Sequence, residues 1–180
     1  MTTPTTDVPD GFIEEFVTES NAIEGVYEQS AIDTSLDAWN HLIQQETLTE
    51  SAIKTTHNIL LEDRQPDIAG HYRNIQVYIN NERPPEPAVV PALMEQLLEW
   101  TPTTEDEIVK WHILFEQIHP FTDGNGRLGR LIYLYHSLSA NIEPTIWRES
   151  ERQDYYTLFD STVHRDSGID TVTINQKHES

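Results

Sequence analysis

The chain has 180 residues, no cysteine and a formal net charge of −20, from 31 acidic and 11 basic residues. This length fits one domain with its own core, and the lack of cysteine excludes disulfides and thiol catalysis. The surplus of acids argues against a basic patch for nucleic acid, and no apolar run approaches membrane-spanning length. The first residues have neither the basic start nor the apolar run of a secretory leader, so we expect a cytoplasmic protein.

Helical spacing of apolar residues recurs along most of the chain. It predicts helices over residues 12–27, 35–48, 49–62, 88–100, 104–118, 127–140 and 150–163. The residues up to about Pro9 and the tail 168–180 lack this spacing, and we expect them to be loose. We find no internal repeat and no linker, so the sequence predicts a single domain over residues 1–180, with a core of about 12–165.

One segment, residues 71–87, has a different pattern. In "IQVYINNERPP", branched residues alternate with polar or aromatic ones and precede two asparagines and a pair of prolines. Such alternation followed by turn residues is typical of a short strand and its turn, and the prolines favour a sheet edge. The fold class that we expect is therefore all-α, with one small β-hairpin.

The segment "IHPFTDGNGRLGR", residues 118–130, concentrates polar residues and glycines between two apolar stretches. The Gly-Asn-Gly run at 124–126 allows a tight turn immediately before a helix that is apolar almost all round. Unpaired backbone N–H groups at the start of such a helix form an anion site. Arg127 and Arg130 are three residues apart and can face the same anion, and two arginines suit phosphates.

An acid and a histidine complete this motif. The carboxylate of Asp123 would repel a phosphate unless a cation lies between them, and Mg²⁺ commonly provides that cation. His119 can accept the proton of an attacking hydroxyl. Each of these residues alone is more commonly structural, but the whole set rarely occurs by chance. Together they predict phosphoryl or nucleotidyl transfer.

The segment "HPFTDGNGRLGR" resembles the signature of the Fic family, H-P-F-x-D/E-G-N-G-R-x-x-R, at every specified position. Members of that family typically transfer AMP from ATP to a hydroxyl side chain of a target protein and release pyrophosphate. The resemblance implies that His119 is the base, that Asp123 holds Mg²⁺ and that Arg130 binds the γ-phosphate. It also implies phosphate binding by the other motif residues, Gly124, Asn125, Gly126 and Arg127.

The resemblance covers most of residues 18–165. Residues 71–87 are similar to the family's flap hairpin, which covers the nucleotide and aligns the target by strand addition. The matching positions are Val77, Tyr78, Ile79 and Asn80, the last in place of a common glycine. The segment "SERQDYY" resembles the adenine-side helix, which implies that Tyr155 and Tyr156 lie near the base. Val163 stands where some relatives carry an asparagine.

A second short stretch, "SNAIEG", begins at Ser20. Taken alone, it is a serine and a glutamate four residues apart on a helix. Beside a Fic signature it resembles the inhibitory motif S/T-x-x-x-E-G/N. The resemblance implies that Ser20 and Glu24 belong to an inhibitory helix of about 12–27, in which Glu24 pairs with Arg130. An arginine arranged for phosphate accepts a carboxylate in the same way.

Three other functions stay open at this point. The chain can transfer a phosphate group or another nucleotide, although related phosphotransferases usually carry a lysine where this chain has Gly126. It can instead remove AMP from a modified target, with Glu24 positioning water. A nucleotide-sensing regulator without enzyme activity is the third, and the presence of both His119 and Asp123 argues against it.

The partners that we expect are ATP, with Mg²⁺, and an unidentified protein that carries a Ser, Thr or Tyr hydroxyl. Self-modification and a homodimer are compatible with the sequence but are not derivable from it. We expect neither nucleic acid nor a membrane as a partner. Because the acidic residues are scattered, they favour a solvated acidic surface over a docking face for a basic partner.

Overall fold

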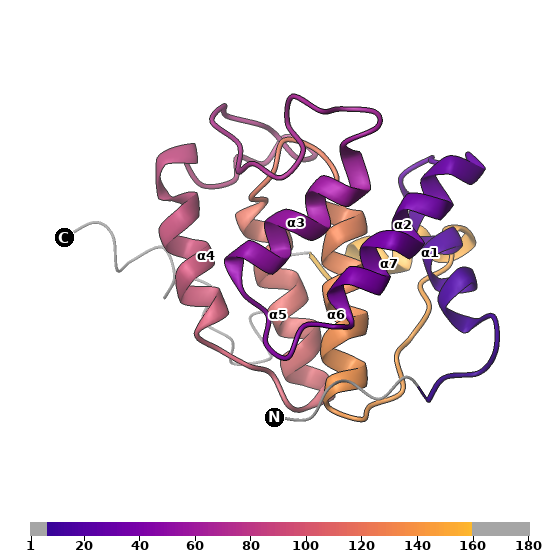
Figure 1. Cartoon of the computed structure of the whole chain (residues 1–180). Helices are drawn as coiled ribbons and strands as arrows, with labels where there is room; N and C mark the ends of the chain where they lie inside the picture. Colours follow the sequence, from indigo (N-terminus) through magenta and orange to yellow (C-terminus); the bar gives the residue numbers. More distant parts are fainter. Residues whose placement is uncertain (1–6, 160–180) are drawn as a thin grey trace.

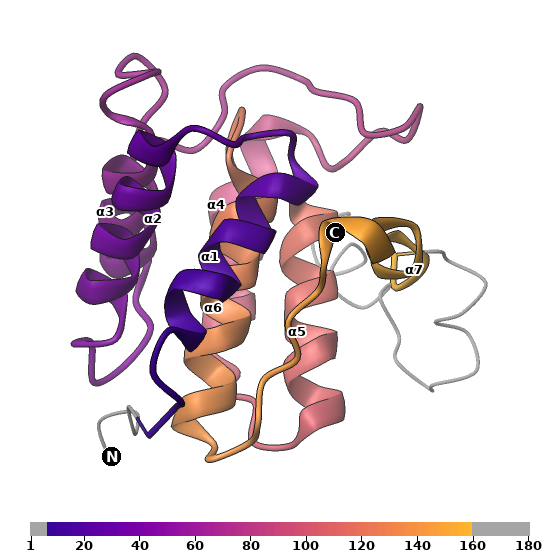
Figure 2. The same cartoon turned by 90° about the vertical axis from the view of Figure 1, so that its right-hand side faces the viewer.

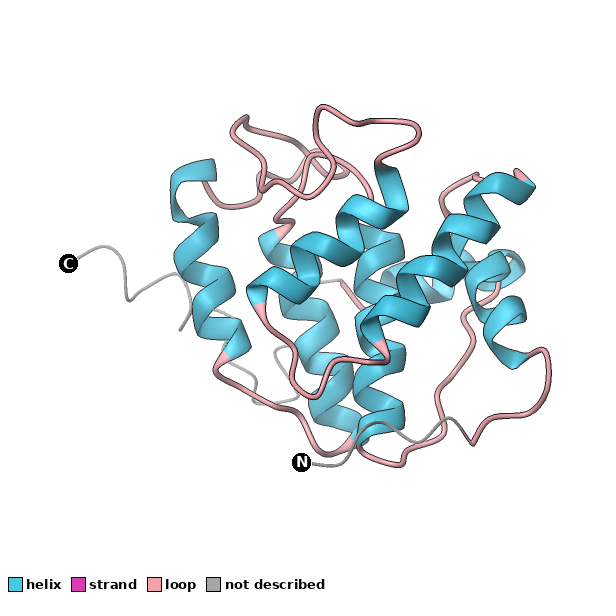
Figure 3. Cartoon of the chain, in the orientation of Figure 1, coloured by secondary structure: helices cyan, strands magenta, loops and turns pink. Residues whose placement is uncertain are grey.

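The computed structural model describes residues 7–159, and every regular element in that range is helical (Figure 1, Figure 3). The α-helices are α1 (Phe12–Ile23), α2 (Gln29–Leu42), α3 (Glu50–Leu61), α4 (Val90–Leu98), α5 (Glu105–Ile118), α6 (Asn125–Ser139) and α7 (Arg152–Thr157). Two 3-10 helices, η1 (Pro87–Val89) and η2 (Glu149–Glu151), precede α4 and α7. Val163, the expected end of the core at 165 and the tail 168–180 lie outside the described residues.

Helix α6 is the centre of the fold. Its apolar sequence is buried almost all round, and Leu128, Ile132 and Leu134 are fully enclosed. Helix α5 lies alongside α6, while α1, α2 and α3 contact α6 from other directions (Figure 2). The core therefore gathers around the helix that follows the signature loop. None of the helices within residues 7–159 combines the length and apolarity needed to cross a membrane.

Local sequence determines where α5 begins and ends. The hydroxyl of Thr104 accepts the N–H of Glu107 (3.3 Å), and the Glu107 carboxylate accepts the N–H of Thr104 (3.2 Å), which forms a capping box. At the other end His119 has a left-handed backbone with a φ of 51°, and Pro120 follows. Gly124, with a φ of 80°, then begins α6. The two helices are thus joined by a short loop that carries the signature residues.

Helix α1 ends in a turn that depends on glycine. Gly25 has a φ of 71°, and its N–H donates to the carbonyl of Ala22 (2.9 Å). The N–H of Val26 donates to the carbonyl of Asn21 (3.0 Å), so the turn is a Schellman motif. Glu24 is consequently the C-cap residue, directly after the last residue of the helix.

Polar contacts hold α1 in place on the bundle. Ser35 on α2 donates from Oγ to Oδ1 of Asn21 (3.1 Å), and both side chains are buried. Near η2, Arg148 pairs with Glu15 (2.7 Å) and approaches Glu19 (3.6 Å). Water screens these exposed ion pairs, so the buried hydrogen bond is the firmer constraint on α1.

The predicted β-hairpin is wrong. Within the described part of the chain no strand forms, and residues 71–87 are a loop closed by one antiparallel bridge between Ile79 and Glu82. The two residues between them, Asn80 and Asn81, have positive φ values of 47° and 69° and make the predicted turn. The turn chemistry was therefore informative, but the strands on either side of it do not pair.

Side chains of the loop occupy the carbonyl groups that a strand ladder would need. Arg73 donates to the carbonyls of Ile75 (3.2 Å) and Pro85 (2.5 Å), and Gln76 donates to that of Pro84 (3.0 Å). The two prolines have no N–H to offer in return. Ile75 is also exposed, so no buried face fixes the register of the loop.

Candidate active site

The start of α6 is arranged to receive an anion. The side chain of Asn125 fastens the loop before it, because Oδ1 accepts the N–H of Phe121 (2.9 Å) and Nδ2 donates to the Phe121 carbonyl (2.8 Å). The first N–H within the helix that finds a carbonyl is that of Leu128, which donates to Gly124 (3.0 Å). The N–H groups of the preceding turn therefore have no intrahelical partner and concentrate positive potential there.

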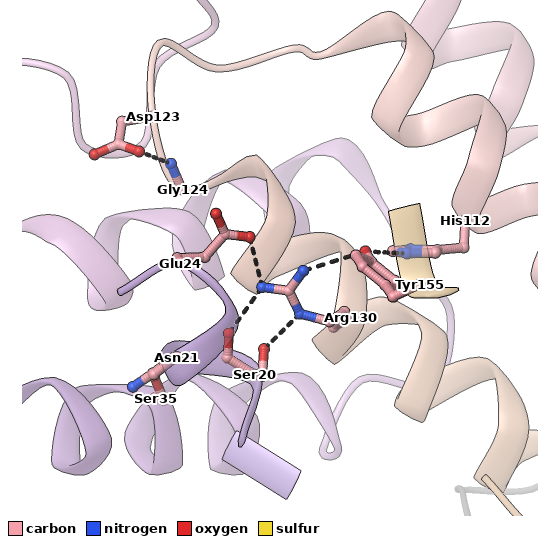
Figure 4. A network of polar contacts seen from close by, with 9 residues as sticks. All are labelled: Ser20, Asn21, Glu24, Ser35, His112, Asp123, Gly124, Arg130 and Tyr155. Atoms are coloured by element: carbon pink, nitrogen blue, oxygen red, sulfur yellow. Dashed lines mark hydrogen bonds and ion pairs between the residues drawn. The ribbon is translucent and has the colours of Figure 1, made fainter. Parts of the chain in front are cut away.

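Arg130 is fully buried at 1% exposure and donates four hydrogen bonds (Figure 4). Its Nε donates to Oγ of Ser20 (2.8 Å), and its Nη2 donates to the Ser20 carbonyl (2.9 Å) and to Oε1 of Glu24 (2.7 Å). Its Nη1 donates to the hydroxyl of Tyr155 (3.1 Å). The pair of Glu24 and Arg130 thus forms across the interface of α1 and α6, whereas Glu24 remains 36% exposed.

Arg127 differs from Arg130 in having no hydrogen-bond or ion-pair partner among residues 7–159. It is buried at 5% exposure, its Nε has no hydrogen bond, and it forms no ion pair with any residue that the structure describes. Burial lowers its pKa, while the charges of Asp123 and Glu24 oppose that change. A buried guanidinium with unused donors is costly unless an anion binds it.

Glu24 lies directly over Gly126. A Cβ atom at residue 126 would collide with Oε1 of Glu24 and would lie 3.1 Å from Nη1 of Arg130. The lack of a side chain at this position therefore opens the space in which the carboxylate lies. The Glu24 carboxylate therefore lies at the start of α6, where a negative charge is favoured.

His119 lies at the end of α5 with Nδ1 buried and without a partner. Burial lowers its pKa to about 4, the carbonyl of Glu116 opposes this change, and the charge of Arg73 adds to it. The imidazole is therefore neutral near pH 7. A neutral imidazole can accept a proton.

Arg73 holds the backbone of His119 in place, and the sequence analysis missed it. Its Nε donates to the His119 carbonyl (2.7 Å) and its Nη2 to the Ile118 carbonyl (3.3 Å). A cation at the carbonyl end of a helix also interacts favourably with the helix dipole. No spacing in the sequence marks this arginine, because its partners are 45 and 46 residues away.

Asp123 is the residue that could hold a metal. Its Oδ2 accepts from Gln65 (2.6 Å) and its Oδ1 from the N–H of Gly124 (2.7 Å). Burial favours its neutral form, but these hydrogen bonds outweigh burial and lower its pKa, so the carboxylate is ionised. The described residues contain no group of three or more His, Asp or Glu side chains that could bind a metal alone. One carboxylate fits Mg²⁺ that is also held by phosphates and water.

His57, on α3, supports this loop and was also missed. Its ring stacks on Phe121 with 3.7 Å between centroids. Its Nδ1 accepts the N–H of Gly70 (2.9 Å), so Nε2 carries the proton and donates to the carbonyl of Asp123 (2.8 Å). Burial lowers the pKa of His57 to about 4, which keeps the ring neutral. An isolated histidine on a helix gives no sequence signal of this role.

The remaining candidate residues lie in two places. Tyr155 is buried at 3% exposure against Arg130, whereas its neighbour Tyr156 is 39% exposed. The residues predicted for the flap, Val77, Tyr78, Ile79 and Asn80, lie on the loop that Arg73 ties to the end of α5. Tyr78 is largely exposed there. The structure therefore brings the signature residues, Glu24 and Tyr155 together and leaves the loop tip at the surface.

The family model described as Fic/DOC matches residues 47–136, which is half of the chain. The chain belongs to the Fic/DOC family. The matched range of this Fic chain includes the signature loop, Arg73 and His57, whereas Ser20, Glu24 and Tyr155 lie outside it.

Curated relatives support the same family. This Fic chain is 34% identical over 133 residues to "Protein adenylyltransferase Fic" of Nematostella vectensis, over 69% of this chain and 31% of that protein. It is 30% identical over 122 residues to the protein of the same name in Drosophila melanogaster, over 64% of this chain and 25% of that protein. The chain thus spans about a quarter to a third of the length of the curated relatives that it matches.

Solved structures share the fold at lower identity. A Fic domain containing signaling protein from Bacteroides thetaiotaomicron superposes with a TM-score of 0.69 at 21% identity, over 82% of this chain and 70% of that one. A fragment of Fic-1 from C. elegans has a TM-score of 0.66 at 19% identity, over 94% of this chain and 63% of that one. This Fic chain therefore has the helical fold of its family.

Proposed function

We propose that this chain transfers AMP from ATP to a hydroxyl side chain of a target protein. The observation that carries the proposal is the pair of buried arginines at the start of α6, of which Arg127 is unpaired and Arg130 binds a carboxylate. Two guanidinium groups beside an open helix N-terminus suit the phosphates of a nucleotide better than a single carboxylate does. The relatives named protein adenylyltransferase support AMP as the group transferred.

In the proposed reaction His119 is the base. Its neutral imidazole accepts the proton of the target hydroxyl as the oxygen attacks the α-phosphorus of ATP. The bond between the α-phosphorus and the oxygen bridging to the β-phosphate breaks, and its electron pair leaves with pyrophosphate. Arg127 and the N–H groups at the start of α6 hold these phosphates and neutralise the charge that develops on them.

Asp123 would hold the Mg²⁺ that accompanies ATP. When it is bound, the ion neutralises phosphate charge and stabilises the pyrophosphate that leaves. The hydrogen bonds from Gln65 and Gly124 hold the carboxylate in place and keep it ionised. Asp123 therefore needs to lose no proton before it binds the metal.

We also infer that Glu24 restrains this transfer. Its carboxylate binds Arg130 and covers Gly126, where we expect the γ-phosphate of ATP to bind. ATP must then displace Glu24 before its phosphates align with His119. Glycine at 126 makes this restraint possible, because any larger residue would exclude the observed position of Glu24.

For the rest of the substrate, we propose that Tyr156 lies near the adenine. Val77, Tyr78, Ile79 and Asn80 are our candidates for contact with nucleotide and target, although they form a loop. Part of Tyr156 is open to a ligand, which suits that role. A Ser, Thr or Tyr acceptor, self-modification, a homodimer and a cytoplasmic location stay predictions of the sequence analysis.

The proposed function can be tested with ATP labelled at either the α- or the γ-phosphate. We expect label from the α position on a protein in cell lysate or on the chain itself, most clearly with Glu24→Gly. His119→Ala should bind ATP as tightly as the parent and transfer no label. Label from the γ position alone would mean that the chain transfers phosphate and not AMP. Binding of ATP without any transfer would indicate a nucleotide-sensing regulator.

A further inference from the structure

Most of the hydrogen bonds of Arg130 do not involve Glu24. Of the four that it donates, two go to Ser20 and one to the hydroxyl of Tyr155. Departure of Glu24 would therefore free part of Nη2 for a phosphate and leave the guanidinium otherwise fixed. The side chains that hold Arg130 in this state decide how well it can meet the nucleotide.

A directed chain of hydrogen bonds runs from Arg130 into the core (Figure 4). Because arginine only donates, the Tyr155 hydroxyl accepts from Nη1 of Arg130 (3.1 Å). That hydroxyl therefore directs its own proton to another acceptor, and Nε2 of His112 lies 2.8 Å away. Burial lowers the pKa of His112 to about 3, so its ring is neutral and Nε2 can accept. The hydroxyl of Tyr155 thus accepts from Arg130 and donates to His112, whose Nδ1 carries the ring proton and has no hydrogen-bond partner among residues 7–159.

His112 is itself held rigidly. It lies on α5, fully buried, and its ring stacks on Trp147 with 5.5 Å between centroids and 16° between planes. The same helix ends at His119, the proposed base. Helix α5 therefore carries both the base and, two turns earlier, the last acceptor of the chain that holds Arg130.

The ring of Tyr155 is enclosed as well. Trp147 lies 5.0 Å and Phe159 5.2 Å from it between centroids, and the guanidinium carbon of Arg130 lies 5.2 Å from its centre. A ring that contacts aromatic neighbours and a cation has little surface left for a base. Its buried hydroxyl, by contrast, points at the arginine.

From these contacts we propose that Tyr155 and His112 are positioning residues, which hold Arg130 in the orientation that binds the terminal phosphate of the nucleotide. This inference rests on the proposed function, because it assumes a nucleotide at the start of α6. It separates the two adjacent tyrosines, with Tyr155 acting on the phosphate end through Arg130 and Tyr156 open to the remainder of the ligand.

The test is the preference for ATP over ADP, measured as the ratio of their dissociation constants in a Glu24→Gly background. Tyr155→Phe keeps the ring and removes the hydroxyl. We expect it to weaken ATP binding at least fivefold and to change ADP binding less than twofold. A partly unfolded sample lowers the number of binding sites but leaves this ratio unchanged, so loss of fold cannot imitate the result.

Two substitutions of His112 test the hydrogen bonds that run from Arg130 through Tyr155 to His112. His112→Leu cannot accept the tyrosine proton and should reproduce Tyr155→Phe, whereas His112→Gln offers an amide oxygen and should restore part of the ATP preference. Tyr133→Phe is the matched control, because its hydroxyl is also buried but accepts from the N–H of Thr145 (3.0 Å). It should leave the ratio unchanged.

Three results would overturn the inference. Equal weakening of ATP and ADP by Tyr155→Phe would assign Tyr155 to the adenine side. An unchanged ratio with Tyr155→Phe would show that Ser20 alone holds Arg130. If His112→Gln and His112→Leu had the same effect, His112 would not act as the hydrogen-bond acceptor that positions Tyr155. Failure of the Glu24→Gly parent to bind any nucleotide would instead contradict the proposed function.

Discussion

The carboxylate of Glu24 lies in the space that a side chain at residue 126 would fill, and residue 126 is a glycine. A Cβ atom at residue 126 would collide with Oε1 of Glu24, which lies 2.7 Å from Nη2 of Arg130. The start of α6 therefore has room for the carboxylate only because residue 126 has no side chain. Substitutions of Glu24 and of Gly126 therefore test the proposed restraint and the proposed phosphate binding.

Glu24→Gly should raise AMP transfer. If the pair with Arg130 contributes about 2–3 kcal/mol, its loss corresponds to roughly 30- to 150-fold. Glu24→Gln should activate partly, because the amide keeps the size and loses the charge. Transfer from α-labelled ATP measures both, with Arg130→Ala as the variant that should not activate. If Glu24→Gly were no more active than the parent, across several targets and in self-modification, Glu24 would have no inhibitory role.

Gly126→Ala should break the pair of Glu24 with Arg130 without activating the enzyme. The added methyl group excludes the carboxylate, but it also lies where the phosphate would bind. In the Glu24→Gly background we expect this change to raise the KM for ATP at least tenfold. Equal KM values for the single and double variants would mean that the phosphate does not lie over residue 126.

His57 should affect the use of Mg²⁺ through the backbone of Asp123. His57→Phe keeps the stack on Phe121 and removes both hydrogen bonds of the ring. We expect the Mg²⁺ concentration for half-maximal transfer to rise about fivefold, beyond any change in kcat. Tyr72→Phe is the control, since its ring also packs against Phe121 (5.3 Å) and its hydroxyl has no partner. A similar shift in the control would indicate a general packing effect.

The pH profile of transfer should lack a step at the usual pKa of histidine. Burial lowers the pKa of His119 to about 4, and only its neutral form can accept a proton. Transfer should therefore be nearly as fast at pH 6.0 as at pH 7.5 and should fall only as the pH approaches 4. A loss of most activity between pH 7.5 and 6.0 would place the pKa of the base near 6.5.

Acid should unfold the protein steeply. Burial lowers the pKa values of His57 and His119 to about 4 and those of His112 and His136 to about 3. The unfolded chain takes up these protons below about pH 6.5, so this stability is present above that pH and is lost as the pH falls. Glu116 opposes the effect, because burial raises its pKa to about 8 and unfolding releases its proton.

The net uptake on unfolding is at most about three protons, which corresponds to at most roughly 4 kcal/mol of unfolding free energy per pH unit near pH 5–6. Urea titrations at pH 7, 6 and 5 measure this slope. His136→Gln removes one titrating group and should flatten it. A free energy of unfolding that is constant over this range would mean that the buried histidines bind protons in the folded state.

The sequence alone predicted the parts of the site that follow one another along the chain. The signature loop and the start of α6 could be named from spacing within a short motif, whereas the pairing of Glu24 with Arg130 was implied by the resemblance of "SNAIEG" to the inhibitory motif. Arg73, His57 and His112 could not, since each acts through partners far away in the chain, as far as 66 residues for His57. A lone buried histidine looks the same in a sequence as one that orients a loop.

The predicted boundaries of α2 and the predicted β-hairpin were wrong for related reasons. The helix predicted over 35–48 is α2 (Gln29–Leu42), because tertiary packing rather than the cap residue sets its start. In the loop 71–87 the alternating pattern is real, but Arg73 and Gln76 bind the carbonyls that strands would pair. Competition from side chains for backbone groups is not visible in a hydrophobic pattern.

Helix α1 contacts Arg130 in two ways, through Glu24 and through Ser20. The helix carries Glu24, which occupies the anion site, yet the hydroxyl and carbonyl of Ser20 supply two of the four acceptors that orient Arg130. If Glu24 restrains transfer as proposed, deleting the helix would remove this restraint together with two of the acceptors that orient Arg130. Exchange of the single side chain of Glu24 would lift the proposed restraint alone, whereas loss of the whole segment would also leave Arg130 without these contacts.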